Sequence, residues 1–246
     1  MEAKAPCASK CSCRVIEFLE SSIGKKIMVA AAGFLLCGFL VAHLAGNLLM
    51  FVGGTAFDRY AEALEHSPLL PLAEGGLVAL FLAHIFLSIR ATLANRAARP
   101  EGYQVYTGKG ARTPGSRTMA VTGTLILVFI IVHVGTLKYD IGGLKGQIEG
   151  QEESLFAHVL GWFANPFYSI FYVLAVGGVG LHLSHGVQSA VQTFGISHPR
   201  YTPLLKKAGL AFAFLIFIGF ASLPVYFGFF HKPAMACCSA PEGGSK

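Results

Sequence analysis

The chain has 246 residues, of which 54% are hydrophobic and only 13% charged, and its formal net charge is +6. A soluble globular domain averages about 25% charged residues. The composition therefore excludes an ordinary cytosolic enzyme, a disordered chain and a disulfide scaffold, and the mean hydropathy of +0.59 indicates an integral membrane protein.

Five apolar stretches are long enough to cross about 30 Å of hydrocarbon, which takes about 20 helical residues. None of them alternates with a period of two, as strands of a membrane barrel do. Helices are then the remaining way to satisfy the backbone in lipid. We therefore predict an all-α integral membrane protein with five transmembrane helices, of which the first four form a bundle. The predicted spans are 27–53, 75–95, 118–139, 167–190 and 208–230.

The connecting segments differ in charge from one side of the predicted bundle to the other. One set, together with Arg90, holds 14 Lys and Arg residues and 4 acids, whereas the other set holds 5 and 9. The positive-inside rule makes the basic set cytoplasmic. The basic residues lie at helix ends without interleaved aromatics, so they do not indicate nucleic-acid binding. The basic set is 1–26, 96–117 and 191–207, and the other is 54–74, 138–166 and 231–246.

This topology divides the chain into three parts. Residues 1–26 are predicted to form a cytoplasmic segment, 27–230 the five-helix transmembrane domain, and 231–246 an external tail. The external stretch 151–163 has the composition of a short interfacial helix, with Trp162 at headgroup depth. His158 within it is predicted to be a surface histidine.

The cysteines give only weak signals. Cys7, Cys11 and Cys13 are spaced either as part of a zinc or iron–sulfur site or as free thiols in a mobile tail, and a complete site needs a fourth ligand. Cys237 and Cys238 lie in the external tail, where a disulfide or free thiols are both compatible with the sequence.

Two histidines are predicted to lie in the outer half of the membrane. With a rise of about 1.5 Å per residue, His43 lies about 25 Å from Lys26 at the cytoplasmic end of its helix. His133 lies about 24 Å from Arg117 in the same way. An ionisable side chain inside the membrane indicates a functional site by default, although an interhelical hydrogen bond explains any single one equally well.

Two further histidines are predicted to lie in the inner half. His84 comes six residues before Arg90 and His182 ten before Gln192, which places each about 9–15 Å from the cytoplasmic end of its helix. His185 follows His182 at i+3 on nearly the same face. It is either the functional histidine instead of His182 or a hydrogen-bond donor to a cofactor propionate or a quinone.

The four helices thus present two pairs of imidazoles at two depths. Facing neutral imidazoles in a bundle suit the axial positions of a haem iron, whereas zinc requires at least a third protein ligand. Glycines in the same spans are explained either by close approach of a macrocycle or by helix packing. They are Gly38, Gly46, Gly123, Gly178 and Gly180.

Short motifs around these histidines support a family resemblance. They are Gly-Lys-Lys before the first span, Ala-His-Leu-Ala-Gly-Asn at 42–47, Ala-His-Ile-Phe-Leu at 83–87, Thr-Gly at 122–123, and Leu-His-Leu-Ser-His-Gly at 181–186 followed by Gly195. Over residues 22–230 the chain resembles the dihaem cytochrome b membrane anchor of succinate:menaquinone oxidoreductases and menaquinol:fumarate reductases, the type with a single five-helix anchor.

The resemblance implies a set of ligands. It assigns His84 and His182 to an inner haem b, and His43 and His133 to an outer haem b, which is the pairing that depth alone suggests. These four histidines would be the axial ligands of the two haem irons.

The resemblance also implies partners. They are a cytoplasmic flavoprotein subunit with FAD and an iron–sulfur subunit, assembled as a dimer of heterotrimers in the bacterial cytoplasmic membrane. This chain has no nucleotide fingerprint and no cysteine set for clusters. Its implied role is to anchor these subunits and to relay electrons between menaquinone and the iron–sulfur subunit.

Two other functions remain compatible with the sequence. One is a dihaem cytochrome b anchor of another respiratory dehydrogenase, such as a hydrogenase or a formate dehydrogenase. The other is a non-haem multi-pass transporter with a histidine proton relay, which predicts broken helices or an internal repeat. The sequence displays neither of these features.

Menaquinol oxidation releases protons, so an external quinol site needs a base. Glu62 and Glu65, in the external loop predicted after the first span, are the candidate proton acceptors, although solvated loop acids have the same appearance. Asn47, at i+4 from His43, is a candidate partner of that ring. Some relatives have a glutamate two positions before the helix-four haem histidine to guide a compensating proton. Here that position is Gly180, which predicts electrogenic turnover.

Overall fold

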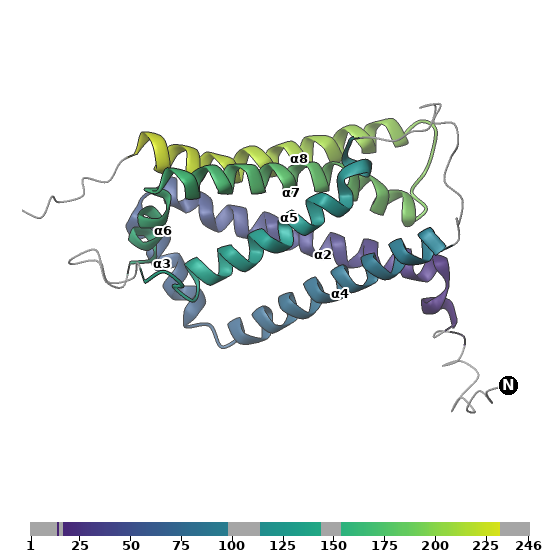
Figure 1. Cartoon of the computed structure of the whole chain (residues 1–246), viewed down its shortest axis with the longest axis horizontal. Coiled ribbons are helices and arrows are strands. Elements are labelled where there is room, and N and C mark those ends of the chain that lie inside the picture. The colour runs from purple at the N-terminus through teal and green to yellow at the C-terminus, as the bar shows by residue number, and fades with distance from the viewer. Residues whose placement is uncertain (1–13, 15–16, 98–113, 144–153, 232–246) are drawn as a thin grey trace, which may run out of the picture.

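The computed structural model describes residue 14 and residues 17–97, 114–143 and 154–231. The regular structure of this part of the chain is entirely helical. Five helices are long and apolar enough to cross a membrane, and they run side by side along the long axis (Figure 1). The predicted all-α, five-span architecture is confirmed. The cysteines of both tails lie outside the described residues.

All five long helices begin before the apolar runs that predicted them, and side-chain caps define where two of them begin. Ser21 Oγ accepts a hydrogen bond from the Gly24 amide at 3.0 Å, and Asn165 Oδ1 accepts from the Phe167 amide at 2.9 Å. The helices are α2 (Ser22–Leu48), α4 (Leu70–Ala97), α5 (Pro114–Leu137), α7 (Pro166–Thr193) and α8 (Thr202–Val225).

Two of the spans end in irregular turns at the same end of the bundle. α2 continues into the 3₁₀ turn η1 (Leu49–Phe51), and α8 continues into the π-helical turn η2 (Tyr226–Phe230). Pro224 precedes η2 and lacks the N–H that a regular helix would use. Inside the described spans the helices are otherwise continuous.

Two short helices cover the end of the bundle opposite the first residue of α2 (Figure 1). α3 (Gly54–Glu65) occupies much of the segment that we expected to be a loop. Its Phe57 is buried and faces Phe156 of α6, with ring centroids 6.5 Å apart. The loop prediction was wrong because this segment gains a helical partner that the sequence does not reveal.

α6 (Leu155–Phe163) confirms the short helix expected within 151–163, and more than half of its residues are buried. His158, expected at the surface, is only 3% exposed. Trp162 packs on Tyr168 of α7 with ring centroids 4.8 Å apart. The surface prediction for His158 is wrong because α6 packs into a buried cluster with Tyr168 and Tyr172 of α7 and Phe227 of η2.

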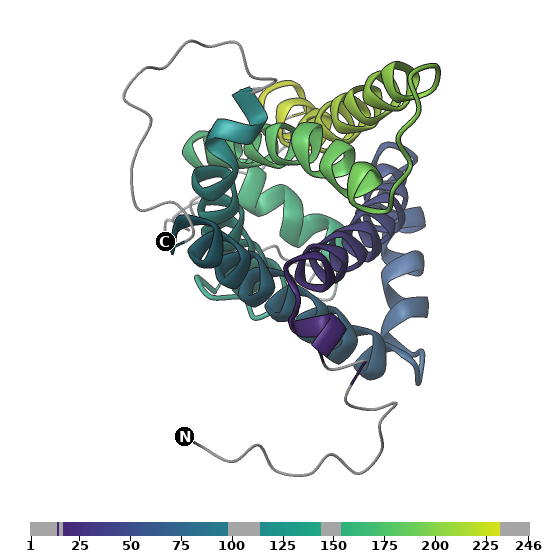
Figure 2. The ribbon, with the colours of Figure 1, turned by 90° about the vertical axis from the view of Figure 1, so that its right-hand side faces the viewer.

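The packing order of the long helices defines the inside of the bundle. α7 packs against α8, α5 and α2, and α2 also packs against α4. Going round the bundle, the first four spans follow the order α4, α2, α7, α5, so α2 lies diagonal to α5 and α4 diagonal to α7. Figure 2 views this arrangement from the end where α2 begins. Among the described residues, neither diagonal pair is closely packed.

Candidate functional site

The outer pair of histidines meets across one diagonal. The rings of His43 on α2 and His133 on α5 lie 5.8 Å apart between centroids, nearly perpendicular at 89°. Phenylalanine rings surround them. Phe39 stacks on His43 at 5.2 Å, Phe220 lies 5.7 Å from the same ring, and Phe129 lies 5.5 Å from His133. The outer pair is therefore enclosed by aromatic side chains.

The inner pair meets across the other diagonal. The rings of His84 on α4 and His182 on α7 lie 6.5 Å apart between centroids, at 69°. His185, one turn further along α7, is half-buried beside His182. The ring contact to His84 comes from His182, so the geometry favours His182 over His185 as its partner.

The two pairs lie at different levels of the bundle. His133 lies opposite Tyr172 of α7, and Thr122 lies opposite His182. Thr122 and His133 are eleven residues apart on α5, which corresponds to about 16 Å along a helix. The arrangement expected from depth, two pairs one above the other, matches these contacts.

The ring spacing fits a metal held between two imidazoles. A metal–imidazole bond is about 2.0 Å long and a ring nitrogen lies roughly 1 Å from its centre, so trans imidazoles have centres about 6 Å apart. The described residues contain no group of three or more His, Cys, Asp or Glu side chains suited to a metal ion. Haem iron needs only two axial protein ligands. The two imidazoles of each pair therefore match the number of protein ligands that a haem iron takes.

One histidine of each pair has its Nδ1 beside a hydroxyl. His133 Nδ1 lies 3.0 Å from Tyr172 Oη, and His182 Nδ1 lies 3.1 Å from Thr122 Oγ1. The other histidine of each pair, His43 in one and His84 in the other, is held by weaker contacts. The Asn47 amide donates to the His43 carbonyl at 2.8 Å and lies 3.4 Å from Nε2 of the ring.

His84 has the least support of the four. Its buried Nδ1 has no partner in hydrogen-bonding geometry among the residues that the structure describes, although the Val29 carbonyl lies beside the ring. Metal-bound histidines usually donate their second N–H to a neighbour, which fixes the ring orientation. This support is therefore strongest at His133 and His182.

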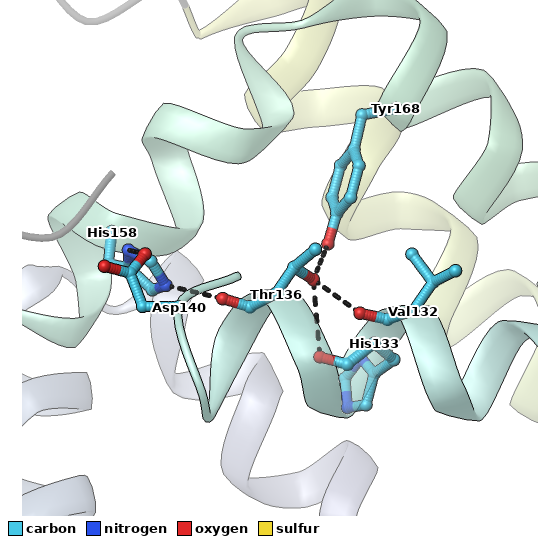
Figure 3. Close-up of polar contacts among 6 residues, drawn as sticks. All are labelled: Val132, His133, Thr136, Asp140, His158 and Tyr168. Carbon is cyan, nitrogen blue, oxygen red and sulfur yellow. Dashed lines mark hydrogen bonds and ion pairs between the residues drawn. The ribbon is translucent and has the colours of Figure 1, made fainter. Parts of the chain in front are cut away.

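A chain of buried hydroxyls continues outward from His133. Tyr172 Oη lies 2.7 Å from Tyr168 Oη, which lies 2.6 Å from Thr136 Oγ1. Thr136 donates in turn to the Val132 carbonyl at 2.8 Å (Figure 3). All three hydroxyl-bearing residues are buried. The outer histidine is thus connected to the backbone of its own helix through α7.

His158 is attached to the same point of α5 from the other side. Its Nε2 donates to the Thr136 carbonyl at 3.1 Å, and its Nδ1 lies 3.9 Å from Asp140 Oδ1 (Figure 3). A buried polar group is retained where it is hydrogen-bonded. This contact explains why a histidine is tolerated inside the buried, apolar helix α6.

The two predicted quinol-site acids lie on the exposed face of α3. Glu62 lines a shallow hollow of about 280 Å³ together with Arg59, Ala63 and His66. Glu65 does not line this hollow. Glu62 and Glu65, which are equal candidates in the sequence, therefore differ in their position relative to the hollow.

Two contacts fix α3 on the bundle. The Tyr60 ring covers Gly46 of α2 so closely that a Cβ there would lie 2.5 Å from it. Asp58 accepts hydrogen bonds from Ser154 Oγ at 2.7 Å and from the Phe156 amide at 2.8 Å, which ties α3 to the start of α6. α3 and α6 therefore form a cap that these contacts hold on one end of the bundle.

The glycines in the spans serve mainly as packing positions. A Cβ at Gly178 would meet Leu125, and one at Gly180 would lie 3.0 Å from Phe217 Cβ on α8. A side chain at Gly180 would therefore point toward α8. Gly123 borders an imidazole, since a Cβ there would lie 3.7 Å from His182 Cε1.

Sequence reasoning missed the hydroxyls at Tyr168, Tyr172 and Thr136. The first two are spaced i,i+4 in the fourth span, which places both hydroxyls on one helix face and is the signal that was available. The comparison with family models, with curated proteins and with solved structures found no match for this chain.

Proposed function

We propose that this chain is the dihaem cytochrome b membrane anchor of a menaquinol:fumarate reductase or succinate dehydrogenase. The observation that supports this most strongly is the pairing of four histidines from four helices, His43 with His133 and His84 with His182, at two levels. Each pair joins two helices that do not pack closely against each other in the described part of the chain.

In this proposal each pair holds one haem b through its two imidazoles. When bound, the haems supply one-electron carriers between the quinone and the iron–sulfur subunit. The protein residues bind and orient the groups, and the phenylalanines around the outer pair exclude water from it. The apolar surroundings and the second-shell hydrogen bonds adjust the potential of each group.

The quinol site lies on the outer side in this proposal. Glu62 accepts a proton from menaquinol at its carboxylate, and the neighbouring Arg59 and His66 provide polar contacts in the same hollow. Glu65 is the weaker candidate because it lies outside the hollow.

The charge distribution supports an orientation with the N-terminus cytoplasmic and α3 and α6 outside. The flavoprotein and iron–sulfur subunits then dock on the basic cytoplasmic face, in the bacterial cytoplasmic membrane. Two such complexes would form the dimer that the resemblance implies.

Charge movement is a further expected property of this arrangement. Electrons that enter at an outer quinol site and leave inward cost about 2.3 kcal/mol each per 100 mV of inside-negative potential. Gly180 faces α8 and carries no acid that could guide a compensating proton. We expect menaquinol:fumarate turnover in proteoliposomes to generate a membrane potential. Turnover without a potential would contradict this expectation.

The proposal is tested by purifying the tagged chain from its native membrane in mild detergent. We expect a flavoprotein with FAD and an iron–sulfur protein to co-purify, with menaquinol:fumarate activity in the complex. Hydrogenase or formate dehydrogenase subunits would instead favour the other dihaem anchor. A purified complex without a b-type absorption band would overturn both and favour the transporter, a function that the continuous helices of the described spans do not support.

A further inference from the structure

His66 lies at the C-terminal cap of α3, and its imidazole turns back onto the helix. Nδ1 of the ring lies 2.9 Å from the Glu62 carbonyl oxygen, and a carbonyl oxygen can only accept a hydrogen bond. Nδ1 therefore carries the proton of this contact. A neutral imidazole has one donor and one acceptor nitrogen, so Nε2 of His66 is the nitrogen with a free lone pair.

The His66 ring lines the same hollow as the Glu62 side chain. Arg59 and Ala63 complete this hollow, and the four residues follow the i, i+3, i+4, i+7 spacing of one helix face. Within the described part of the chain, neither the Glu62 carboxylate nor Nε2 of His66 has a hydrogen-bond or ion-pair partner. The hollow thus presents two unused proton acceptors, an oxygen and a nitrogen, beside a guanidinium group.

The contact between α3 and α2 places this hollow near the outer histidine pair. The Tyr60 ring packs directly on Gly46 of α2, where a Cβ would lie 2.5 Å from it. Gly46 comes three residues after His43, which corresponds to about 4.5 Å along the helix. The helix that carries the hollow is therefore packed within about one turn of an outer histidine.

The oxidation of a quinol sets a requirement on such a site. A 1,4-quinol that becomes a quinone releases two electrons and two hydroxyl protons. In the proposed function the electrons leave to the outer one-electron carrier, so the protons have to pass to acceptors at the site. The two hydroxyls lie on opposite sides of the ring, so one carboxylate cannot contact both of them in one bound pose.

We propose that His66 is a second catalytic residue of the quinol site, with Nε2 as the acceptor of one hydroxyl proton and the Glu62 carboxylate as the acceptor of the other. Each O–H bond breaks as its proton passes to its acceptor, and the quinol becomes the quinone as two electrons leave. This inference rests on the proposed function, because it adds a residue to the same site. Histidine is the side chain that serves most often in general acid–base catalysis.

The contact between His66 and Glu62 also has a purely structural explanation. A histidine near the end of a helix can bond to one of the last carbonyls and stabilise the helix end. Such a cap needs only Nδ1–H, whereas proton transfer needs the lone pair of Nε2. His66→Gln separates the two roles, because glutamine retains N–H donors for the carbonyl but has no basic nitrogen.

The test uses the full chain with its native partner subunits. The variants are His66→Gln and His66→Ala, with His231→Gln as the matched control. His231 is also exposed, and it directly follows η2 at the same end of the bundle. The readouts are kcat and KM for menaquinol, the Kd of a hydroxyquinoline N-oxide as a quinol analogue, and the rescue of His66→Ala by added imidazole.

We expect His66→Gln to lower kcat by about 10²-fold, the lower end of the effect of a positioned base, with little change in KM or in analogue binding. Added imidazole should restore turnover in His66→Ala but not in Glu62→Gln, and His231→Gln should resemble the wild type. Normal turnover in His66→Gln would overturn the inference, as would a loss in His66→Ala on which imidazole has no effect.

Failure of the proposed function has a different signature. A wild-type complex that does not oxidise menaquinol overturns that function and this inference with it. Wild-type oxidation together with normal turnover in His66→Gln overturns this inference alone. The tautomer is measured separately by ¹⁵N NMR of labelled histidine in the full chain. We expect Nδ1–H in the neutral His66 ring, and Nε2–H there would also overturn the inference.

Discussion

The outer and inner levels of the bundle use the same two side chains in different surroundings. The outer pair lies among three phenylalanine rings, is connected to a buried hydroxyl chain and lies beneath the cap of α3 and α6. The inner pair has Thr122 as its hydrogen-bond partner, and its α4 helix has no buried residue in its most apolar window. The outer geometry is therefore supported by packing on more sides than the inner geometry.

The position of α4 illustrates the difference. A stripe of large apolar side chains on this helix faces away from the bundle and is more than half exposed, as expected for a surface that meets lipid. Within the described part of the chain, Nδ1 of its bundle-facing His84 has no hydrogen-bond partner. The stripe comprises Val78, Leu82, Phe86, Ile89 and Leu93. The inner level is consequently the one that removal of a cofactor should loosen more.

The largest expected effect is the loss of one haem when one of its two histidine ligands is replaced. His133→Ala and His182→Ala should each lose one haem and retain the other, because the pairs share no ligand. His185→Ala should retain both, since the ring contact to His84 comes from His182. Haem-to-polypeptide ratios and redox difference spectra of the three variants measure this. Loss of both haems from one substitution would show that the levels are not independent.

The next largest effect is expected at Glu62, the acid that lines the hollow on α3. A positioned general base contributes about 10²- to 10⁴-fold to a rate, so Glu62→Gln should reduce menaquinol-linked turnover by about 10²-fold or more. Glu65→Gln is the matched control, with nearly normal turnover expected. Normal menaquinol oxidation in the double variant Glu62→Gln, Glu65→Gln would rule out both acids.

A smaller effect tests the cap itself. Asp58→Ala removes the acceptor of two hydrogen bonds to α6. Hydrogen bonds to charged groups contribute about 1.5–3 kcal/mol, and Asp58 is partly solvated, so we expect a loss of about 2 kcal/mol. Thermal release of each haem, followed by its own spectral component, should occur earlier at the outer level only. Equal release from both levels would contradict the role of the cap.

The smallest effect concerns the ion pair between Lys138 and Glu74, which joins the end of α5 to the beginning of α4. Both side chains are nearly half exposed, and surface pairs contribute about 0–1 kcal/mol. Lys138→Met should therefore change the melting temperature of the complex by only a few degrees and leave both haems in place. A large loss of the inner haem in this variant would show that the ion pair, and not the histidine pair, holds α4.

Much of the fold could be predicted because helices in lipid must be long, apolar and internally hydrogen-bonded. The depth of His43, His84, His133 and His182 also follows from helical rise alone. The cap could not be predicted, since burial of His158 depends on which surface α6 meets. The hydroxyl partners of the histidines depend on the rotation of α5 against α7, which span composition does not determine.

The most direct test of the account is the number and ligation of haems in the purified wild-type chain with its native subunits. A pyridine haemochrome count combined with low-temperature EPR measures both quantities. We expect two b-type haems per polypeptide, each low-spin with two histidine ligands. Fewer than two haems, or a high-spin ferric centre with one free axial position, would contradict it.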